Sequence, residues 1–141
     1  MRKIAMFAVA GMAATAVILA GEPAMAQVPQ KQVTLTGAKE APTRGDANGR
    51  GQFTWSLDGT RLCYLLSVQR IGKATQAHIH RGRVGVAGNV VVPLVAPTPA
   101  SAACATLTPA LATALRNNPR RFYVNVHNAR FGAGAIRAQL N

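Results

Sequence analysis

The segment GQFTWSLDGTRLCYLLSV, residues 51–68, indicates the fold class of the chain. Apolar and polar side chains alternate on both sides of Asp58 and Gly59, which is the pattern of two half-buried β-strands. Asp-Gly between two such runs is a strong signal for a tight β-hairpin turn. Residues 51–57 and 61–68 are therefore expected to pair as antiparallel strands. The side chains expected to face the core from the first strand are Phe53, Trp55 and Leu57.

Similar alternation recurs along the rest of the chain. The further expected strands are residues 31–36, 77–80, 89–95, 122–127 and 135–140. Pro93 removes a backbone donor from one of them and indicates a sheet edge or a bulge. Thr108 and Pro109 are a cap and first turn for one short helix, and the small residues 96–103 before it are expected to form a loop. The sequence predicts an all-β fold, an antiparallel Greek-key β-sandwich or flattened barrel of about seven or eight strands with one short helix.

The first 26 residues have the composition of a secretory signal peptide. Arg2 and Lys3 form a basic start, residues 4–20 are apolar, and Ala24-Met25-Ala26 is a small-x-small cleavage pattern. The apolar run is rich in alanine and short for a bilayer span, so a cleaved signal is expected rather than a membrane anchor. The remaining domain, residues 27–141, has no second long apolar run. It is expected to be periplasmic or secreted, with no membrane span after cleavage.

The expected mature domain is strongly basic. Leaving out Arg2, Lys3 and Glu22 leaves 14 basic and three acidic side chains, a net charge of +11. This charge would attract polyanions, so a polyanion-binding protein is one of the functions that stay open. No basic stretch alternates with aromatic residues, so no specific nucleic-acid partner is expected.

Two cysteines, Cys63 and Cys104, lie in this domain. An oxidising compartment favours their pairing, and a disulfide that closes a loop of roughly 40 residues contributes about 3–4 kcal/mol. The cysteines are widely separated and form no Cys-x-x-Cys motif. A disulfide is therefore expected in preference to a redox centre or a thiolate metal site.

All three histidines of the chain lie in expected strands. Residues two apart in a strand point to the same face at about 6.6–6.8 Å separation, so His78 and His80 share one face. The same alternation in YVNVH places His127 on one face with Tyr123 and Asn125. If the two strands lie close together, three imidazoles converge on one point and form a donor set for copper or zinc. The alternative is that the histidines are solvated or hydrogen-bonded to neighbouring loops.

Two longer segments contain these histidines: AHIHRGRVGVAGNVVVPL, residues 77–94, and NPRRFYVNVHNARFGAGAIRAQL, residues 118–140. Together they resemble the CHRD domain, the module named after chordin that also occurs singly in many secreted bacterial proteins. The resemblance covers nearly all of residues 27–141 and includes the opening VTLTGAKEAP. Two positions depart from the family pattern: Ala135 stands in place of the usual acidic residue and Ala138 in place of a frequent glycine.

The resemblance implies a fold and a compartment more firmly than a reaction. Most single-domain bacterial members have no established activity, and in chordin the domains belong to an extracellular protein that binds growth factors. The first functional interpretation is therefore a secreted binding module with a protein or polysaccharide ligand, which could hold copper or zinc through its histidines. An enzyme is not expected, because no serine, free cysteine or pair of acids forms a conventional catalytic set.

The expected sandwich and the His-x-His pair are also similar to copper–zinc superoxide dismutase. This chain has too few histidines and acids for the complete metal set of that enzyme. Three histidines with an open position would still suit copper or zinc, so a copper-dependent redox enzyme or a copper-handling protein is the alternative function. Asn125 and Arg137 are expected to support the histidines or a loop, or Arg137 donates to a main-chain carbonyl.

Overall fold

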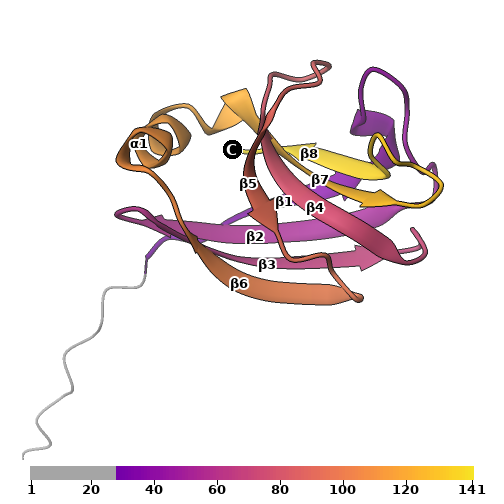
Figure 1. Cartoon of the computed structure of the whole chain (residues 1–141), viewed down its shortest axis with the longest axis horizontal. Coiled ribbons are helices and arrows are strands. Elements are labelled where there is room, and N and C mark those ends of the chain that lie inside the picture. The colour runs from indigo at the N-terminus through magenta and orange to yellow at the C-terminus, as the bar shows by residue number, and fades with distance from the viewer. Residues whose placement is uncertain (1–27) are drawn as a thin grey trace, which may run out of the picture.

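The computed structural model describes residues 28–141 and shows one antiparallel sheet that curls into a nearly closed, flattened barrel (Figure 1). The eight strands are β1 (Lys31–Thr36), β2 (Arg50–Asp58), β3 (Arg61–Gln69), β4 (Ala74–Arg81), β5 (Val90–Leu94), β6 (Ala100–Thr106), β7 (Phe122–Asn128) and β8 (Ile136–Gln139). Their order in the sheet is β5-β4-β7-β8-β1-β2-β3-β6. The predicted all-β fold class is confirmed. The expected signal peptide, residues 1–26, lies outside the described residues.

The hairpin that the sequence indicates is formed by β2 and β3. The two strands pair along their full length, and Asp58 lies opposite Arg61, so the two turn residues are Gly59 and Thr60. Gly59 has a φ of +53°, a left-handed conformation that glycine adopts without steric cost. Phe53 and Trp55 of β2 are buried as expected, which orients the hairpin on the core.

Two layers of the curled sheet enclose the hydrophobic core. Figure 1 shows β1, β2, β3 and β6 in one layer and β5, β4, β7 and β8 in the other. Fully buried side chains from both layers meet between them; they include Leu35, Phe53, Leu66, Ile79, Val124 and Ile136. β5 and β6, the two edge strands, are not paired with each other, but Ser101 Oγ donates to the Val95 carbonyl at 2.8 Å. Pro93 lies in the edge strand β5, as the sequence predicts.

The prediction of a loop over residues 96–103 is wrong for its second half, because strand β6 begins at Ala100. β6 pairs with β3 and places Cys104 directly opposite Cys63, with which it forms a disulfide. The disulfide that the sequence predicts is therefore present. The sequence ASAACAT has no large apolar side chain, so it carries no periodic signal by which the strand could be recognised.

Among residues 28–141 there is one α-helix, α1 (Pro109–Asn117), which connects β6 to the other layer. Thr108 Oγ1 accepts a hydrogen bond from the Leu111 amide at 3.3 Å, which is the expected cap, and Leu115 is buried. The short 3₁₀ turns η1 (Gly37–Lys39) and η2 (Pro119–Arg121) follow β1 and precede β7. Among residues 28–141 no helix has the length and apolarity needed to cross a membrane.

Candidate metal centre

The three histidines lie on the outer face of the neighbouring strands β4 and β7. His80 is opposite Tyr123 and His78 opposite Asn125 in the ladder, and His127 is opposite Gln76. Between them, Ala77 and Ile79 point into the core and are 1% and 0% exposed. The prediction that His78, His80 and His127 share one face, and come together if the strands are adjacent, is therefore confirmed.

This outer face is covered by loops rather than open to solvent. His80 and His127 are each only 8% exposed, whereas His78 is half-buried. The β4–β5 loop lies against His80, and the β7–β8 loop lies against His127, as their hydrogen bonds to Gly88 and Gly132 show. The cluster is consequently buried on two sides and accessible beside His78.

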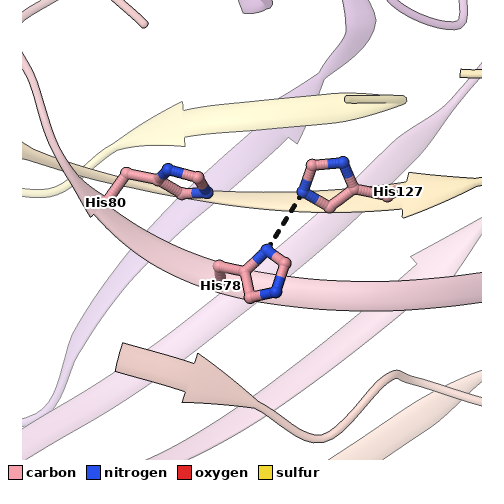
Figure 2. A group of neighbouring side chains, drawn as sticks. All are labelled: His78, His80 and His127. Atoms are coloured by element: carbon pink, nitrogen blue, oxygen red, sulfur yellow. Dashed lines mark hydrogen bonds between the residues drawn. The ribbon is translucent and has the colours of Figure 1, made fainter. Parts of the chain in front are cut away.

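The ring nitrogens of the cluster converge. Figure 2 shows the three imidazoles turned toward one another, and one ligand atom from each lies within 4.8 Å of the others. His78 Nδ1 and His127 Nε2 are 3.1 Å apart. Nitrogens bound at 2.0–2.1 Å around a tetrahedral metal are separated by about 3.3 Å. Small rotations of the rings would therefore bring all three nitrogens within bonding distance of one ion.

Backbone carbonyls determine which nitrogen of each buried ring carries the proton. His80 Nδ1 lies 2.8 Å from the Gly88 carbonyl, and His127 Nδ1 lies 2.9 Å from the Gly132 carbonyl. A carbonyl oxygen only accepts, so each Nδ1 is the protonated donor, and in a neutral His80 the Nε2 then presents a lone pair, whereas His127 Nε2 faces the Asn125 amide oxygen at 3.1 Å. His80 Nε2 is buried and has no hydrogen-bond partner among the described residues. This is how metal-binding histidines are usually oriented by the groups behind them.

The surroundings also keep two of the rings neutral. Burial lowers the pKa of His78, and the nearby His127 and His80 lower it further. Burial likewise lowers the pKa of His127, although its hydrogen bond to Gly132 opposes the shift. Neutral imidazole is the form that coordinates a metal, so both side chains are ready to act as ligands near neutral pH.

Tyr123 connects the histidines to Arg137. The rings of His80 and Tyr123 stack at 4.7 Å with only 6° between their planes. From β8, on the other side of β7, the Arg137 guanidinium carbon lies 3.3 Å from the centre of the same tyrosine ring. Tyr123 Oη accepts a hydrogen bond from the Gly88 amide at 3.1 Å. Tyr123 thereby supports both His80 and the loop whose carbonyl orients it.

Arg137 is 1% exposed, although alternation places it on the outer face of β8. Its Nη2 donates to the Arg83 carbonyl at 2.8 Å, which is the main-chain bond that the sequence left as one alternative. Burial lowers the pKa of Arg137, against the opposing effects of Tyr123 and Glu40. Arg137 contacts the histidine cluster through Tyr123.

Glu40, which follows η1, is the acidic side chain whose charge raises the pKa of Arg137. It is 7% exposed, and burial raises its pKa to about 7, against the lowering effects of the Arg137 charge, the Ala41 amide and the Asn125 side chain. A Cβ added to Gly134 would lie 2.4 Å from the Glu40 carboxyl group, so this glycine makes room for it. Burial disfavours ionisation of Glu40 while the Arg137 charge favours it, and Ala135 is a buried apolar residue.

The two residues predicted to support the histidines, Asn125 and Arg137, lie at different distances from the cluster. Asn125 Oδ1 is 3.1 Å from His127 Nε2 and so lies in the cluster itself, whereas Arg137 is one residue removed. Sequence reasoning missed the contributions of Glu40 and of the Gly88 and Gly132 carbonyls. The only available signal for Glu40 was the scarcity of acids in this part of the chain, and backbone carbonyls carry no sequence signal.

The fold and the cluster define an antiparallel β-domain with a covered, histidine-rich outer face. The CHRD domain family matches residues 31–140, so the chain belongs to that family. The resemblance seen in the sequence is confirmed. No curated protein and no solved structure matches the chain.

Proposed function

We propose that this CHRD domain is an exported binding module that holds one copper or zinc ion through His78, His80 and His127. The observation that carries the proposal is the buried Nε2 of His80, which has no partner in the described structure and lies beside two other imidazole nitrogens. A buried polar atom without a partner costs about 1–3 kcal/mol. A metal ion bound to the three nitrogens would remove that cost.

Asn125 and Arg137 have supporting roles in this proposal. Asn125 contacts His127 directly, and Arg137 packs on the tyrosine that stacks with His80. Because His78 is only half-buried, the side of the ion next to it would face solvent or a partner. A protein or polysaccharide ligand of the module would reach the ion from that side.

Imidazole ligands suit both metals, and divalent copper generally binds a given nitrogen site more tightly than zinc. The accessible flank at His78 also favours the second candidate, a copper-dependent redox enzyme or copper-handling protein, because an open position is what a catalytic metal site retains. Redox turnover by the copper-loaded protein would support this second candidate. Tight binding without turnover would support the module alone.

Export to the periplasm or outside the cell is part of the proposal. The basic start and apolar run of residues 1–26 favour it, and so does the disulfide, since disulfides persist in oxidising compartments. The third candidate, a polyanion-binding protein, rests on the net charge alone. It predicts an affinity for polyanions that falls steeply with salt concentration.

The test is a titration of the metal-stripped protein with copper(II) and with zinc(II), followed by measurement of bound metal by elemental mass spectrometry. His80→Phe keeps an aromatic ring to stack on Tyr123 but removes the Nε2 ligand. We expect it to weaken binding by more than about 100-fold, since even supporting residues change metal affinity by about 10–100-fold. Gln76→Ala is the matched control, because Gln76 is exposed and lies on the same strand, opposite His127.

Near-stoichiometric metal in the wild type and in Gln76→Ala, with loss in His80→Phe, would support the site. Circular dichroism of each variant distinguishes a lost ligand from a lost fold. If the wild type binds neither metal, the histidines are structural and the proposal is wrong.

A further inference from the structure

The β4–β5 loop, residues 82–89, projects from the body of the domain (Figure 1). Val84 and Val86 lie in this loop and are 78% and 51% exposed, and Val90, where the chain re-enters the sheet, is 48% exposed. Single exposed valines are ordinary, but three within seven residues form an apolar tip. We call Val84, Val86 and Val90 the valine tip.

The loop backbone is held in place by hydrogen bonds at several points. The Val86 amide donates to the Arg83 carbonyl at 3.1 Å, and Gly85 has a φ of +76°, so Val84 occupies the corner of a tight turn. At its base, the Arg81 amide donates to the Asn89 carbonyl at 3.0 Å. A Cβ on Gly88 would lie 1.7 Å from the Arg81 carbonyl oxygen, so the loop closes too tightly for any other residue. The valines are therefore presented by a defined backbone.

Four exposed arginines lie around the base of the loop. They are Arg81 at the end of β4, Arg83 of the loop, and Arg120 and Arg121 of η2. The Gly82 amide donates to the Arg121 carbonyl at 2.8 Å, and Gln139 Nε2 donates to the carbonyls of Gly82 and Arg120. These bonds join η2 to the loop. We call the four residues the arginine collar.

No acidic side chain of the described region belongs to the β4–β5 loop or to η2, although the strand registers put Asp58 at the same end of the sheet as the start of β7. Residues 28–141 contain only three acidic side chains, Glu40, Asp46 and Asp58. Glu40 is buried, and Asp46 bonds through its backbone to Ala135 beyond the opposite end of β7. Asp58 ends β2 at the hairpin with β3. The collar thus presents positive charge beside an apolar tip.

The opposite end of β4 and β7 provides an internal comparison. Arg70, Lys73 and Arg130 also lie together there, lining one surface depression. Their only large apolar neighbour in that depression, Ile71, is 3% exposed. Positive charge occurs at both ends of the layer. At the opposite end Asp46 lines the same depression and Val95, 56% exposed, follows β5, whereas three exposed valines lie together at the β4–β5 loop.

We propose that the valine tip and the arginine collar form a docking site for an anionic lipid bilayer. Apolar side chains enter the boundary between headgroups and acyl chains, and arginines bind the lipid phosphates, as in other proteins that lie on a membrane surface. An acidic polysaccharide would pair with the arginines but would leave the valines exposed. Contact through one loop is peripheral and reversible.

The experiment is co-sedimentation of the purified protein with vesicles of phosphatidylcholine alone or of equal parts phosphatidylcholine and phosphatidylglycerol. We expect binding to the anionic vesicles only. Each basic residue near a charged membrane contributes about fivefold in affinity, so Arg83→Gln, Arg120→Gln and Arg121→Gln together should weaken binding by about 100-fold. Val84→Ser with Val86→Ser should weaken it at least about tenfold, because both side chains would enter the bilayer.

Each variant has a matched control at another place on the surface. Arg70→Gln, Lys73→Gln and Arg130→Gln remove the same charge from the opposite end, and Leu65→Ser with Val95→Ser remove two half-exposed apolar residues elsewhere. Neither control should change binding more than about threefold if the loop is the docking site.

Three outcomes would overturn the proposal. The first is equal binding to both kinds of vesicle, and the second is binding that does not change when the valines are replaced. The third is a loss of binding in the charge control as large as that in the collar variant, which would mean that the whole basic surface attracts the vesicles. Heparin binding is measured in parallel. Retention of heparin by the valine variant, together with no vesicle binding by the wild type, would assign the collar to a polysaccharide instead.

Discussion

Both faces of β7 are buried, and so is the outer face of β4 at His80, but the inner and outer faces differ completely in chemistry. On the inner face Ile79 and Val124 are fully buried in the hydrophobic core, whereas on the outer face His80, Asn125 and His127 are 8%, 2% and 8% exposed. The inner face is buried by the second sheet layer and the outer face by loops. Apolar side chains need only a close-packed neighbour, but buried polar groups need hydrogen-bond partners. The outer face therefore depends on a few directional contacts.

The largest expected difference between the two faces is in the loss of folding stability when neighbouring residues of β4 are replaced by alanine. Ile79→Ala should destabilise the domain by about 3 kcal/mol, because it removes buried methyl groups and leaves a cavity in the core. His78→Ala, one residue away on the half-buried outer face, should cost less than about 1 kcal/mol in metal-free protein. Urea unfolding measures both. Equal losses would show that the outer face is packed as tightly as the core.

The buried carboxyl group of Glu40 should make the stability of the domain depend on pH. Its pKa of about 7 in the folded protein lies above the ordinary value of 4.5 because of burial, so folding favours the protonated carboxyl group. Its contribution to stability is therefore fully present below pH 4.5 and is lost as pH rises through 7. A shift of this size corresponds to about 3 kcal/mol between pH 4.5 and pH 8. Glu40→Gln should remove this dependence.

The measurement is the free energy of unfolding of wild type and Glu40→Gln at several pH values in that range. We expect the variant to gain stability relative to the wild type as pH rises. Asp58→Asn, in the exposed end of the β2–β3 hairpin, is the control for removing one acid. A constant difference between wild type and Glu40→Gln would mean that the carboxyl group titrates normally.

The difference between the inner and outer faces of β4 and β7 also explains how much could be predicted from the sequence. Alternation placed Ile79 inward and His78, His80 and His127 together, because the period of two depends only on backbone geometry. It could not show that the outer face is covered. Alternation marks Arg137 as outward, and the residue is buried only because the β4–β5 loop and the segment containing Glu40 fold over it.

Two further features depended on long-range contacts. β6 has small side chains and is recognisable as a strand only beside β3, where Cys104 meets Cys63. The histidine tautomers depend on the carbonyls of Gly88 and Gly132, which loops bring to the rings. The residue types of the candidate site were therefore predictable, but the orientation of each ring required the tertiary structure.

The smallest expected effect is the pH-dependent contribution of His78 and His127 to the stability of the metal-free protein. Because burial lowers the pKa of His78 and of His127, folding favours their neutral forms. Their contribution to stability is fully present above the ordinary value of 6.5 and is lost as pH falls through the folded pKa values, which is opposite in sign to the contribution of Glu40. His78 is half-buried, so water weakens its share.

Nuclear magnetic resonance titration of the ring protons measures these pKa values residue by residue. We expect both to lie below 6.5, and we expect Glu40→Gln to expose the opposing histidine contribution as a stability that rises with pH between about 5 and 7. Titration of His78 and His127 at 6.5 would contradict this prediction, and titration above 6.5 would show that the fold favours their charged forms. The loops would then stabilise imidazolium rather than a set of metal ligands.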